Sequence, residues 1–217
     1  MVELVDISKT YTLKGIRKVI FEHLSFQFPR GRNVAIMGPN GAGKSTLLRL
    51  IAGTESADSG RIYRNVRVSW PLGFSGGFNG SMTGLENVRF VSRIYGQDTE
   101  RVIEYVEDFS GLGPSMRLPI KTYSSGMKAR LAFGLSMAID FDCYLIDEIT
   151  AVGDANFRRK SKEALEQKLD HSRIIMVSHS QETIKSYCDC GLLLTHEGLS
   201  YHDDVPSLLR AYNESCA

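Results

Sequence analysis

The stretch that most constrains this chain is GPNGAGKS, which runs from Gly38 to Ser45. It fits the pattern G-x-x-x-x-G-K-[ST], follows the apolar segment NVAIM and precedes STLLRLIAG, whose apolar residues recur at helical spacing. Glycines let backbone N–H groups turn inward, and a helix N-terminus adds partial positive charge, so such a loop can cradle phosphate. A strand, this loop and a helix in that order predict a nucleotide-binding site.

The loop also supplies the first candidate ligands. Lys44 offers a full positive charge to the phosphates, and the Ser45 hydroxyl is a candidate ligand of Mg²⁺. The nucleotide-binding residues predicted from the loop are Gly38, Pro39, Asn40, Gly41, Ala42, Gly43, Lys44, Ser45 and Thr46.

Three further chemical groups follow apolar segments. The segment CYLID ends in Asp147 and is followed by Glu148, and the segment RIIMVS is followed by His179. Ligands of open parallel sheets collect at the carboxyl ends of the strands, so we expect all three near the phosphate loop. We predict that Asp147 helps to hold Mg²⁺ and that Glu148, on the opposite side of the strand, polarises the attacking water. His179 is expected to contact the γ-phosphate or that water.

The order of the segments predicts the fold class. The first third is rich in strand-like segments, residues at about 84–140 have helical periodicity, and the last third alternates apolar strands with helices up to a final strand, LLLTHEG. Unbroken apolar strands separated by helices are typical of an α/β fold with a parallel sheet. We therefore predict one domain over residues 1–217, with a helical subdomain at about 84–140 inserted in it.

Composition excludes several classes of protein. The net charge is +1, which gives no basic field for nucleic acid. No apolar run approaches the ~20 residues that cross a bilayer, and the N-terminus lacks the pattern of a signal peptide. We expect a cytosolic protein whose membrane role, if any, comes through a partner. Because the cysteines lack zinc-site spacing, we expect reduced thiols at Cys143, Cys188, Cys190 and Cys216.

The segment KTYSSGMK, which opens a predicted helix, resembles the signature motif of ATP-binding-cassette (ABC) ATPases. The resemblance implies their P-loop NTPase fold, with a mostly parallel core sheet, an N-terminal antiparallel β-subdomain and a helical insertion. It also implies that two copies enclose two ATP molecules, and that the signature contacts the ATP held by the other copy through Ser124, Ser125, Gly126 and Met127. By the same resemblance, Asp154 in the segment AVGD belongs to a dimer-interface loop, and Tyr11 stacks on adenine.

Three segments are similar to the ATPase subunits of Gram-negative capsular polysaccharide exporters of the group 2 type: SWPLGFSGGFNGSMTGLENV, TYSSGMKARLAFGLSMAIDFDCYLIDE and AVGD. This similarity implies ATP and Mg²⁺ as cofactors, a homodimer, and a polytopic transmembrane permease subunit as partner. It also implies an indirect link to periplasmic and outer-membrane polysaccharide export proteins, and a location at the cytoplasmic face of the bacterial inner membrane. Related O-antigen exporter ATPases often carry a further C-terminal sugar-binding domain. Because this sequence ends soon after the cassette, we expect the capsule type.

The stretch SWPLGFSGGFNGSMTG departs from the family pattern. ABC ATPases normally carry a glutamine here near the metal and the attacking water, but this stretch has none, and Gly73 falls near the expected position. Either a water or a backbone carbonyl can take that place. The aromatic residues Trp70, Phe74 and Phe78 are candidates to line a groove for a helix of the permease. The alternative is that they pack within the ATPase itself.

Other functions fit the sequence less well. The nearest alternative is the ATPase subunit of an O-antigen or teichoic-acid exporter. A soluble ABC ATPase acting on nucleic acid or ribosomes is disfavoured by the single cassette, the absence of a long insertion and the small net charge. A small-molecule kinase would lack the signature at Ser124. A degenerate cassette that binds but barely hydrolyses ATP is disfavoured by the intact Lys44, Glu148 and His179.

Overall fold

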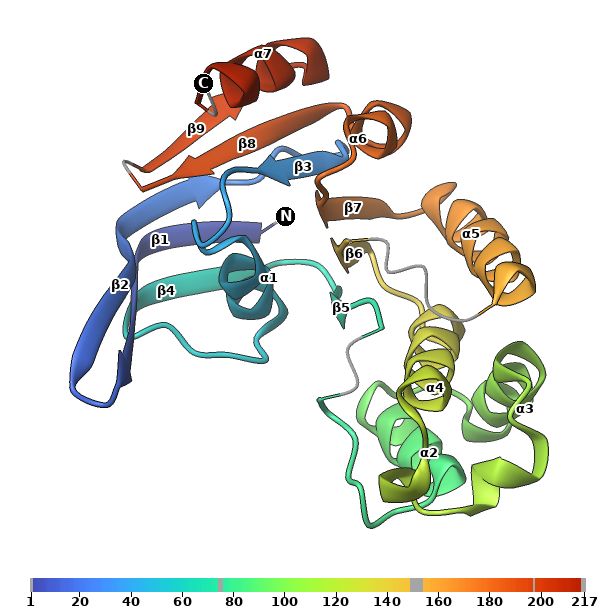
Figure 1. The fold of residues 1–217 in the computed structure, drawn as a ribbon. Coiled ribbons are helices and arrows are strands. Elements are labelled where there is room, and N and C mark those ends of the chain that lie inside the picture. Colours follow the sequence, from blue (N-terminus) through green and yellow to red (C-terminus); the bar gives the residue numbers. More distant parts are fainter. Residues whose placement is uncertain (1, 74–75, 149–153, 197, 216–217) are drawn as a thin grey trace. The chain divides into compact units, whose positions relative to one another are not determined.

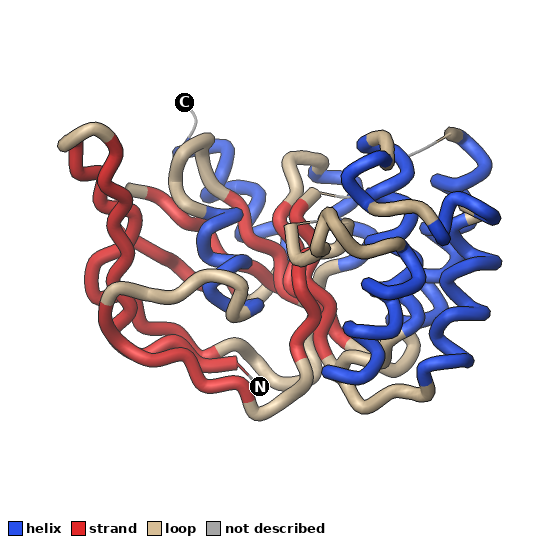
Figure 2. Tube along the Cα trace, turned by 90° about the horizontal axis from the view of Figure 1, so that it is seen from below, coloured by secondary structure: helices blue, strands red, loops and turns tan. Residues whose placement is uncertain are grey.

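The computed structural model describes residues 2–73, 76–148, 154–196 and 198–215, which divide into two compact units (Figure 1). The first unit comprises the described residues within 1–71, 141–149 and 172–217, and it contains every strand of the described part. The second unit comprises those within 72–140 and 150–171, and its regular elements are all helices (Figure 2).

A three-stranded antiparallel sheet begins the first unit. Its order is β2-β1-β4, with β1 at Val2–Leu13, β2 at Ile16–Gln27 and β4 at Ser59–Arg64. Strands β1 and β2 are joined by a two-residue turn in which Lys14 and Gly15 have φ of 50° and 82°. Positive φ at both central residues is what a type I′ hairpin turn requires, so this local conformation favours the tight antiparallel pairing.

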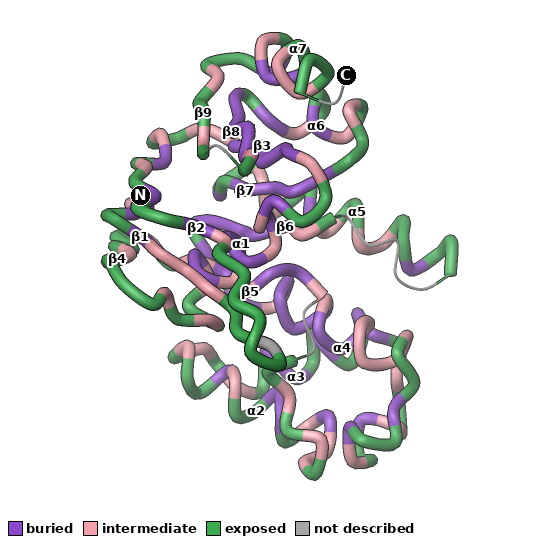
Figure 3. Tube along the Cα trace, turned by 60° about the vertical axis from the view of Figure 1, so that its left-hand side comes forward, coloured by how far each residue is buried: buried purple, intermediate pink, exposed green. Residues whose placement is uncertain are grey.

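A six-stranded sheet forms the core of the first unit, in the order β5-β6-β7-β3-β8-β9. The bounds are β5 Val68–Pro71, β6 Cys143–Asp147, β7 Arg173–Val177, β3 Val34–Met37, β8 Cys190–Thr195 and β9 Gly198–His202. The first five strands run parallel and β9 pairs antiparallel with β8. Strands β3, β7 and β8 are buried over most of their length (Figure 3), as expected for a parallel sheet. The predicted fold class is therefore confirmed.

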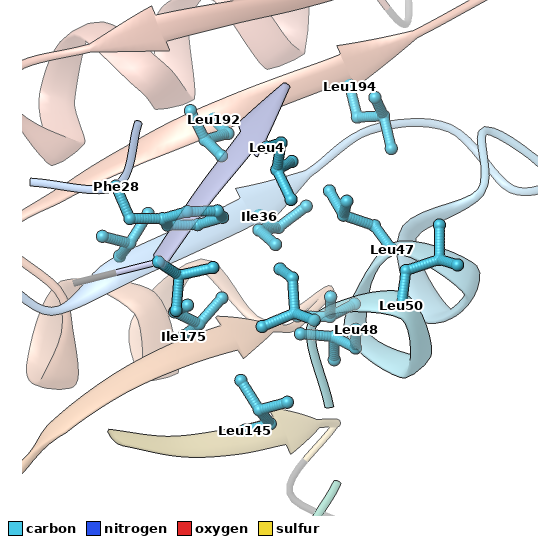
Figure 4. Packing of buried hydrophobic residues seen from close by; sticks show 14 of the residues in the cluster. Leu4, Phe28, Ile36, Leu47, Leu48, Leu50, Leu145, Ile175, Leu192 and Leu194 are labelled. Atoms are coloured by element: carbon cyan, nitrogen blue, oxygen red, sulfur yellow. The ribbon is translucent and has the colours of Figure 1, made fainter. Parts of the chain in front are cut away.

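The two faces of this sheet carry different partners. Alternate residues such as Val34 and Ile36 pack in one apolar cluster with residues of α1 (Lys44–Ala52) and of the antiparallel sheet (Figure 4). On the other face lies α7, whose Leu208 packs against Gly191 in β8, and in Figure 1 this helix runs along β8 and β9. Full burial of a leucine contributes roughly 1.5–3 kcal/mol, so the cluster anchors α1 and the loop before it.

The C-terminus of α1 is capped by a strand of the antiparallel sheet. The guanidinium of Arg64 donates hydrogen bonds to the carbonyl oxygens of Ile51 and Leu50, both at 2.6 Å. Gly53 follows with φ of 77°, the left-handed conformation that ends many helices. The C-terminus of the helix that carries the phosphate loop is thus tied to the antiparallel sheet.

Replacing Arg64 with alanine is expected to lower the free energy of unfolding by about 1 kcal/mol, because the last carbonyls of α1 lose charged donors. Urea unfolding followed by circular dichroism measures this change. The matched control is Arg61→Ala on the same strand, since the side chain of that exposed arginine forms no hydrogen bond or ion pair with the described part of the chain. Equal destabilisation by the two substitutions would contradict the capping role.

The helical unit is ordered by caps and an aromatic cluster. Its helices are α2 (Gly84–Ile94), α3 (Thr99–Ser110), α4 (Ser125–Ala138) and α5 (Ala155–Leu169), with short 3₁₀ turns at Gly113–Arg117 and Ile120–Thr122. Thr83 and Glu86 form a reciprocal capping box at the start of α2. Phe109, Phe133 and Phe157 meet with ring centroids 5.6–6.3 Å apart, which joins α3, α4 and α5.

The helical unit holds the described residues within 72–140 and 150–171, α5 included, and the helical segment expected at about 84–140 lies within it. One expectation about the last elements is wrong. The segment LLLTHEG is not the last element, because an antiparallel edge strand, β9, follows β8, and α7 (Val205–Ser215) follows β9. The short helix α6 (Gln181–Tyr187) lies between β7 and β8 in the chain. Asp204 caps the N-terminus of α7, because its carboxylate accepts a hydrogen bond from the Ser207 N–H at 2.7 Å. No helix of the described residues is both long and apolar enough to cross a bilayer.

Candidate functional site

A cavity of about 560 Å³ opens at the carboxyl ends of the parallel strands in the first unit. This volume lies within the range typical of small-molecule sites. The residues that line it are Tyr11, Lys18, Ile20, Asn40, Gly41, Gly43, Lys44, Ser45, Thr46, Asp147, Glu148, Val177 and His179. Residues far apart in the sequence therefore meet around one cavity because the parallel strands all end there.

The loop between β3 and α1 depends on glycine at two positions. Gly43 has φ of 98°, and a Cβ atom on it would lie 2.6 Å from Cγ2 of Ile20. Gly38 has φ of 150°, and a Cβ atom there would collide with the carbonyl oxygen of Leu194 in β8. A side chain at either position would displace the loop from the sheet, so the close approach requires glycine.

Lys44 is the first residue of α1 and is only 8% exposed. Its ammonium group donates hydrogen bonds to the carbonyl oxygens of Gly38 and Pro39, at 2.7 and 2.9 Å. The charge is thereby held at the loop, beside the N-terminus of the helix. Helix dipole and ammonium together make this end of the cavity favourable for an anion.

The other predicted loop residues divide into two groups. Asn40, Gly41, Ser45 and Thr46 line the cavity, as Gly43 and Lys44 do. Gly38, Pro39 and Ala42 are not among the lining residues, and Ala42 is buried in the apolar cluster. Gly38, Pro39 and Ala42 therefore contribute to the shape of the loop and do not line the cavity.

The two acids and the histidine lie together on the same cavity. Strand β6 ends at Asp147, and the next residue, Glu148, has φ of 51° while its N–H donates to the Val177 carbonyl at 2.9 Å. Asp147 and Glu148 both line the cavity, as expected for two acids at the carboxyl end of this strand. Nε2 of His179 lies 3.5 Å from Oε1 of Glu148. Such a pair can position a water and take a proton from it.

Tyr11 lines the same cavity from strand β1, although sequence reasoning alone could not separate it from a packing residue. Three lining residues were not predicted from the sequence: Lys18, Ile20 and Val177. The hairpin register pairs Lys18 with Tyr11, and this brings a lysine near the loop, where a Cβ on Gly41 would be 3.9 Å from its Nζ. No signal in the sequence distinguishes Lys18 from other exposed lysines.

The signature-like segment lies in the helical unit. Ser124 is the N-cap of α4, and its hydroxyl accepts a hydrogen bond from the Met127 N–H at 3.2 Å. Ser124 and Ser125 are exposed, whereas Gly126 and Met127 are half-buried. Tyr123 is buried. The exposed N-terminus of this helix has free backbone donors that can bind an anion.

Asp154 is held inside the helical unit by two contacts. Its carboxylate accepts from the Phe157 N–H at 2.9 Å, which caps α5, and it pairs with the Arg130 guanidinium at 2.7 Å. The N–H of Phe157 and the charge of Arg130 lower the pKa of Asp154. Residues 151–153, the rest of the predicted interface loop, lie outside the described part of the chain. Within that part, α4 and α5 are thus joined by the Arg130–Asp154 ion pair.

The aromatic stretch divides between two environments. Trp70 is half-buried, and its ring packs edge-to-face on Phe141 with centroids 5.3 Å apart, so it is used at least in part for internal packing. Phe78 is half-buried and Phe74 lies outside the described residues. Gly73, at the expected glutamine position, has φ of 77° and brings no side-chain ligand.

Known proteins resemble this chain over most of its length. Residues 21–151 match the family model described as ABC transporter. The polysialic acid transport ATP-binding protein KpsT of Escherichia coli is 50% identical over 99% of both chains, and the capsule polysaccharide export ATP-binding protein CtrD of Neisseria meningitidis is 46% identical over 98% of this chain and 99% of its own. The dimeric post-hydrolysis structure of the ATP-binding cassette MJ0796 with ADP and Pi has a TM-score of 0.71 at 19% identity, covering 93% of this chain and 98% of that one.

Proposed function

Since the chain belongs to the ABC transporter family, we propose that it is the ATP-hydrolysing subunit of a transporter that exports capsular polysaccharide across the inner membrane. The observation that carries the proposal is the single cavity on which the phosphate loop, two acids and a histidine meet. Similarity over the full length to capsule-export subunits supports the choice of substrate class. The family resemblance inferred from the sequence is confirmed.

ATP is proposed to bind with its phosphates on the loop and its base near Tyr11. Backbone N–H groups and the Lys44 ammonium would hold the phosphate oxygens, and the helix dipole of α1 would add to their charge. Lys18 is proposed as a further cation toward the phosphate chain, because it lines the cavity beside the loop. Tyr11 offers an aromatic face for adenine.

The donor groups at this cavity fit a magnesium ion. Mg²⁺ takes oxygen ligands and is usually held by one or two protein groups together with phosphates and water. The hydroxyl of Ser45 and the carboxylate of Asp147 line the same cavity and are the proposed protein ligands. When bound, the ion supplies charge neutralisation on the phosphate oxygens.

Hydrolysis is proposed to use the pair at the strand ends. Glu148 would accept a proton from the attacking water, and His179, 3.5 Å from it, would orient that water or donate to the γ-phosphate. Lys44 would stabilise the charge that spreads over the phosphoryl oxygens as the bond to the leaving group lengthens. Glu148 and His179 follow the ends of β6 and β7, and Lys44 is the first residue of α1.

Coupling to transport is proposed to use a second copy of the chain. The start of α4, from Ser124 to Met127, would contact the γ-phosphate of ATP held by the other copy, with Asp154 in the interface loop. Two copies would then close around ATP and reopen after hydrolysis, a population shift driven by ligand affinity. The chain would lie at the cytoplasmic face of the inner membrane, bound to a polytopic transmembrane permease that follows this motion. Through the permease it would be linked indirectly to periplasmic and outer-membrane export proteins.

Reconstitution with the candidate permease tests this function. The chain should co-purify with that subunit, and lipid-linked capsular polysaccharide should stimulate ATP hydrolysis in proteoliposomes. Vesicles without polysaccharide, and vesicles with lipid-linked O-antigen or teichoic acid, serve as matched controls. Stimulation by O-antigen or teichoic acid alone would move the substrate to that class. Failure to bind the permease, together with stimulation by nucleic acid or ribosomes, would overturn the transport role.

A further inference from the structure

The hydroxyl of Tyr11 is tied into a network of charged side chains beneath the cavity. It donates a hydrogen bond to Oε1 of Glu55 at 2.5 Å and accepts one from the Arg49 guanidinium at 3.2 Å. Glu55 also pairs with Lys9 at 3.0 Å and with Arg49 at 2.9 Å. The side chains of Glu55 and Lys9 are only 18% and 12% exposed. A carboxylate that is largely shielded and held by three donors fixes the position of the tyrosine ring.

The same network reaches the helix that carries the phosphate loop. Arg49 lies on α1, and its guanidinium donates to the Thr46 hydroxyl at 3.1 Å. That hydroxyl also lies 3.5 Å from the hydroxyl of Tyr11. Thr46 and Tyr11 both line the cavity, although they come from different elements. The network therefore sets the distance between the phosphate end of the cavity and its aromatic end.

The ring of Tyr11 has a cation on one side. The ammonium of Lys9 lies 5.3 Å from the ring centroid, within the range of a cation–π contact. Lys9 does not line the cavity, whereas Tyr11 does, so part of the ring is left for the cavity. The cation–π contact holds the ring from the side of Lys9, and the rest of the ring can stack on a base.

We propose that Glu55, together with Lys9 and Arg49, positions Tyr11 as the platform for the nucleobase. This inference rests on the proposed function, because it takes ATP as the ligand of the cavity. Glu55 acts through Tyr11 and is a positioning residue. Without it, the ring would have to be ordered when the nucleotide binds, and the entropy of ordering would weaken binding.

The charge state of Glu55 is consistent with this role. Burial alone would raise the pKa of Glu55. The hydrogen bonds that Glu55 accepts from Tyr11, Arg49 and Lys9 nevertheless lower that pKa below its ordinary value. The carboxylate therefore stays ionised at neutral pH and continues to accept the hydrogen bond from the Tyr11 hydroxyl. The network needs no change of protonation when the nucleotide enters.

Two ligands separate a base platform from a phosphate site: ADP and inorganic pyrophosphate, each titrated by calorimetry with magnesium. Glu55→Ala is expected to weaken ADP binding about fivefold, a fraction of what base stacking contributes, and to leave pyrophosphate binding within about twofold. Glu55→Gln, which keeps an acceptor for the hydroxyl, should recover most of the loss. The matched control is Asp6→Asn, an exposed carboxylate paired with His23 on the same sheet.

A double-mutant cycle with Tyr11→Phe tests whether Glu55 acts through the hydroxyl. The two substitutions together should weaken ADP binding no more than the larger single effect, because they break the same contact. Equal weakening of ADP and pyrophosphate, unchanged ADP binding in Glu55→Ala, or strictly additive effects would overturn the inference. If the unaltered protein binds pyrophosphate as tightly as ADP, there is no base platform. If it binds neither, the proposed ATPase function fails instead.

Discussion

Replacing Glu148 with glutamine is expected to lower ATP turnover by about 100-fold or more, because the amide cannot accept the proton of the attacking water. The amide has nearly the same shape as the carboxylate, and Glu148 is not in the phosphate loop, so binding of ATP should remain. The variant should accumulate as an ATP-loaded dimer. Phosphate release measures the turnover, and light scattering after size exclusion measures the ATP-dependent dimer.

The control for this substitution is Glu163→Gln on α5. Glu163 is exposed, and its one ion pair among the described residues is a long i,i+4 pair with Arg159 at 3.9 Å. The turnover of Glu163→Gln should therefore match that of the unaltered protein. Turnover at the unaltered rate in Glu148→Gln would remove Glu148 from the role of base. Slow turnover without the ATP-dependent dimer would keep the base but contradict the proposed closure of two copies.

Replacing Lys44 with methionine is expected to weaken ATP binding about 10-fold to 100-fold, because a charged donor to phosphate is lost. Turnover should fall by about 100-fold or more even at saturating ATP, since the ammonium also stabilises the transition state. Methionine matches the length of the stem, so the buried position stays filled. Calorimetric titration and phosphate release report the two effects separately.

The control for Lys44→Met is Lys185→Met on the exposed face of α6, which should change neither quantity. Thermal unfolding of both variants checks that the loss of the contacts to Gly38 and Pro39 has not unfolded the chain. A folded Lys44→Met protein with unaltered turnover would place the γ-phosphate elsewhere in the molecule. Weak binding with unaltered turnover at saturation would restrict Lys44 to ground-state binding.

Sequence alone was sufficient for the parts of the site that depend on adjacent residues. The phosphate loop could be predicted because its glycines, its lysine and the following helix occur in one continuous segment. Asp147, Glu148 and His179 could be added because each follows an apolar strand, and parallel strands share a carboxyl edge. The order of the strands in the sheet was not needed for this step.

Features that depend on strand register or on distant partners could not be predicted. The place of Lys18 on the cavity comes from its pairing with Tyr11 across a hairpin. The contact of Glu55 with Tyr11 joins residues that only the packing of α1 on the antiparallel sheet brings together. The left-handed backbone at Glu148 could not be predicted either, because the alternation of side chains along a strand says nothing about the residue after the strand ends.

That turn has a consequence for protein engineering. A left-handed backbone at a residue other than glycine costs about 1–2 kcal/mol, so glycine at position 148 would relax the chain. A screen for heat resistance alone would therefore reward the loss of this carboxylate. The gain in thermal tolerance would come with the loss of the proposed proton acceptor. Stability therefore favours glycine at position 148, whereas the proposed hydrolysis requires glutamate there. A stabilised version of the protein has to retain Glu148.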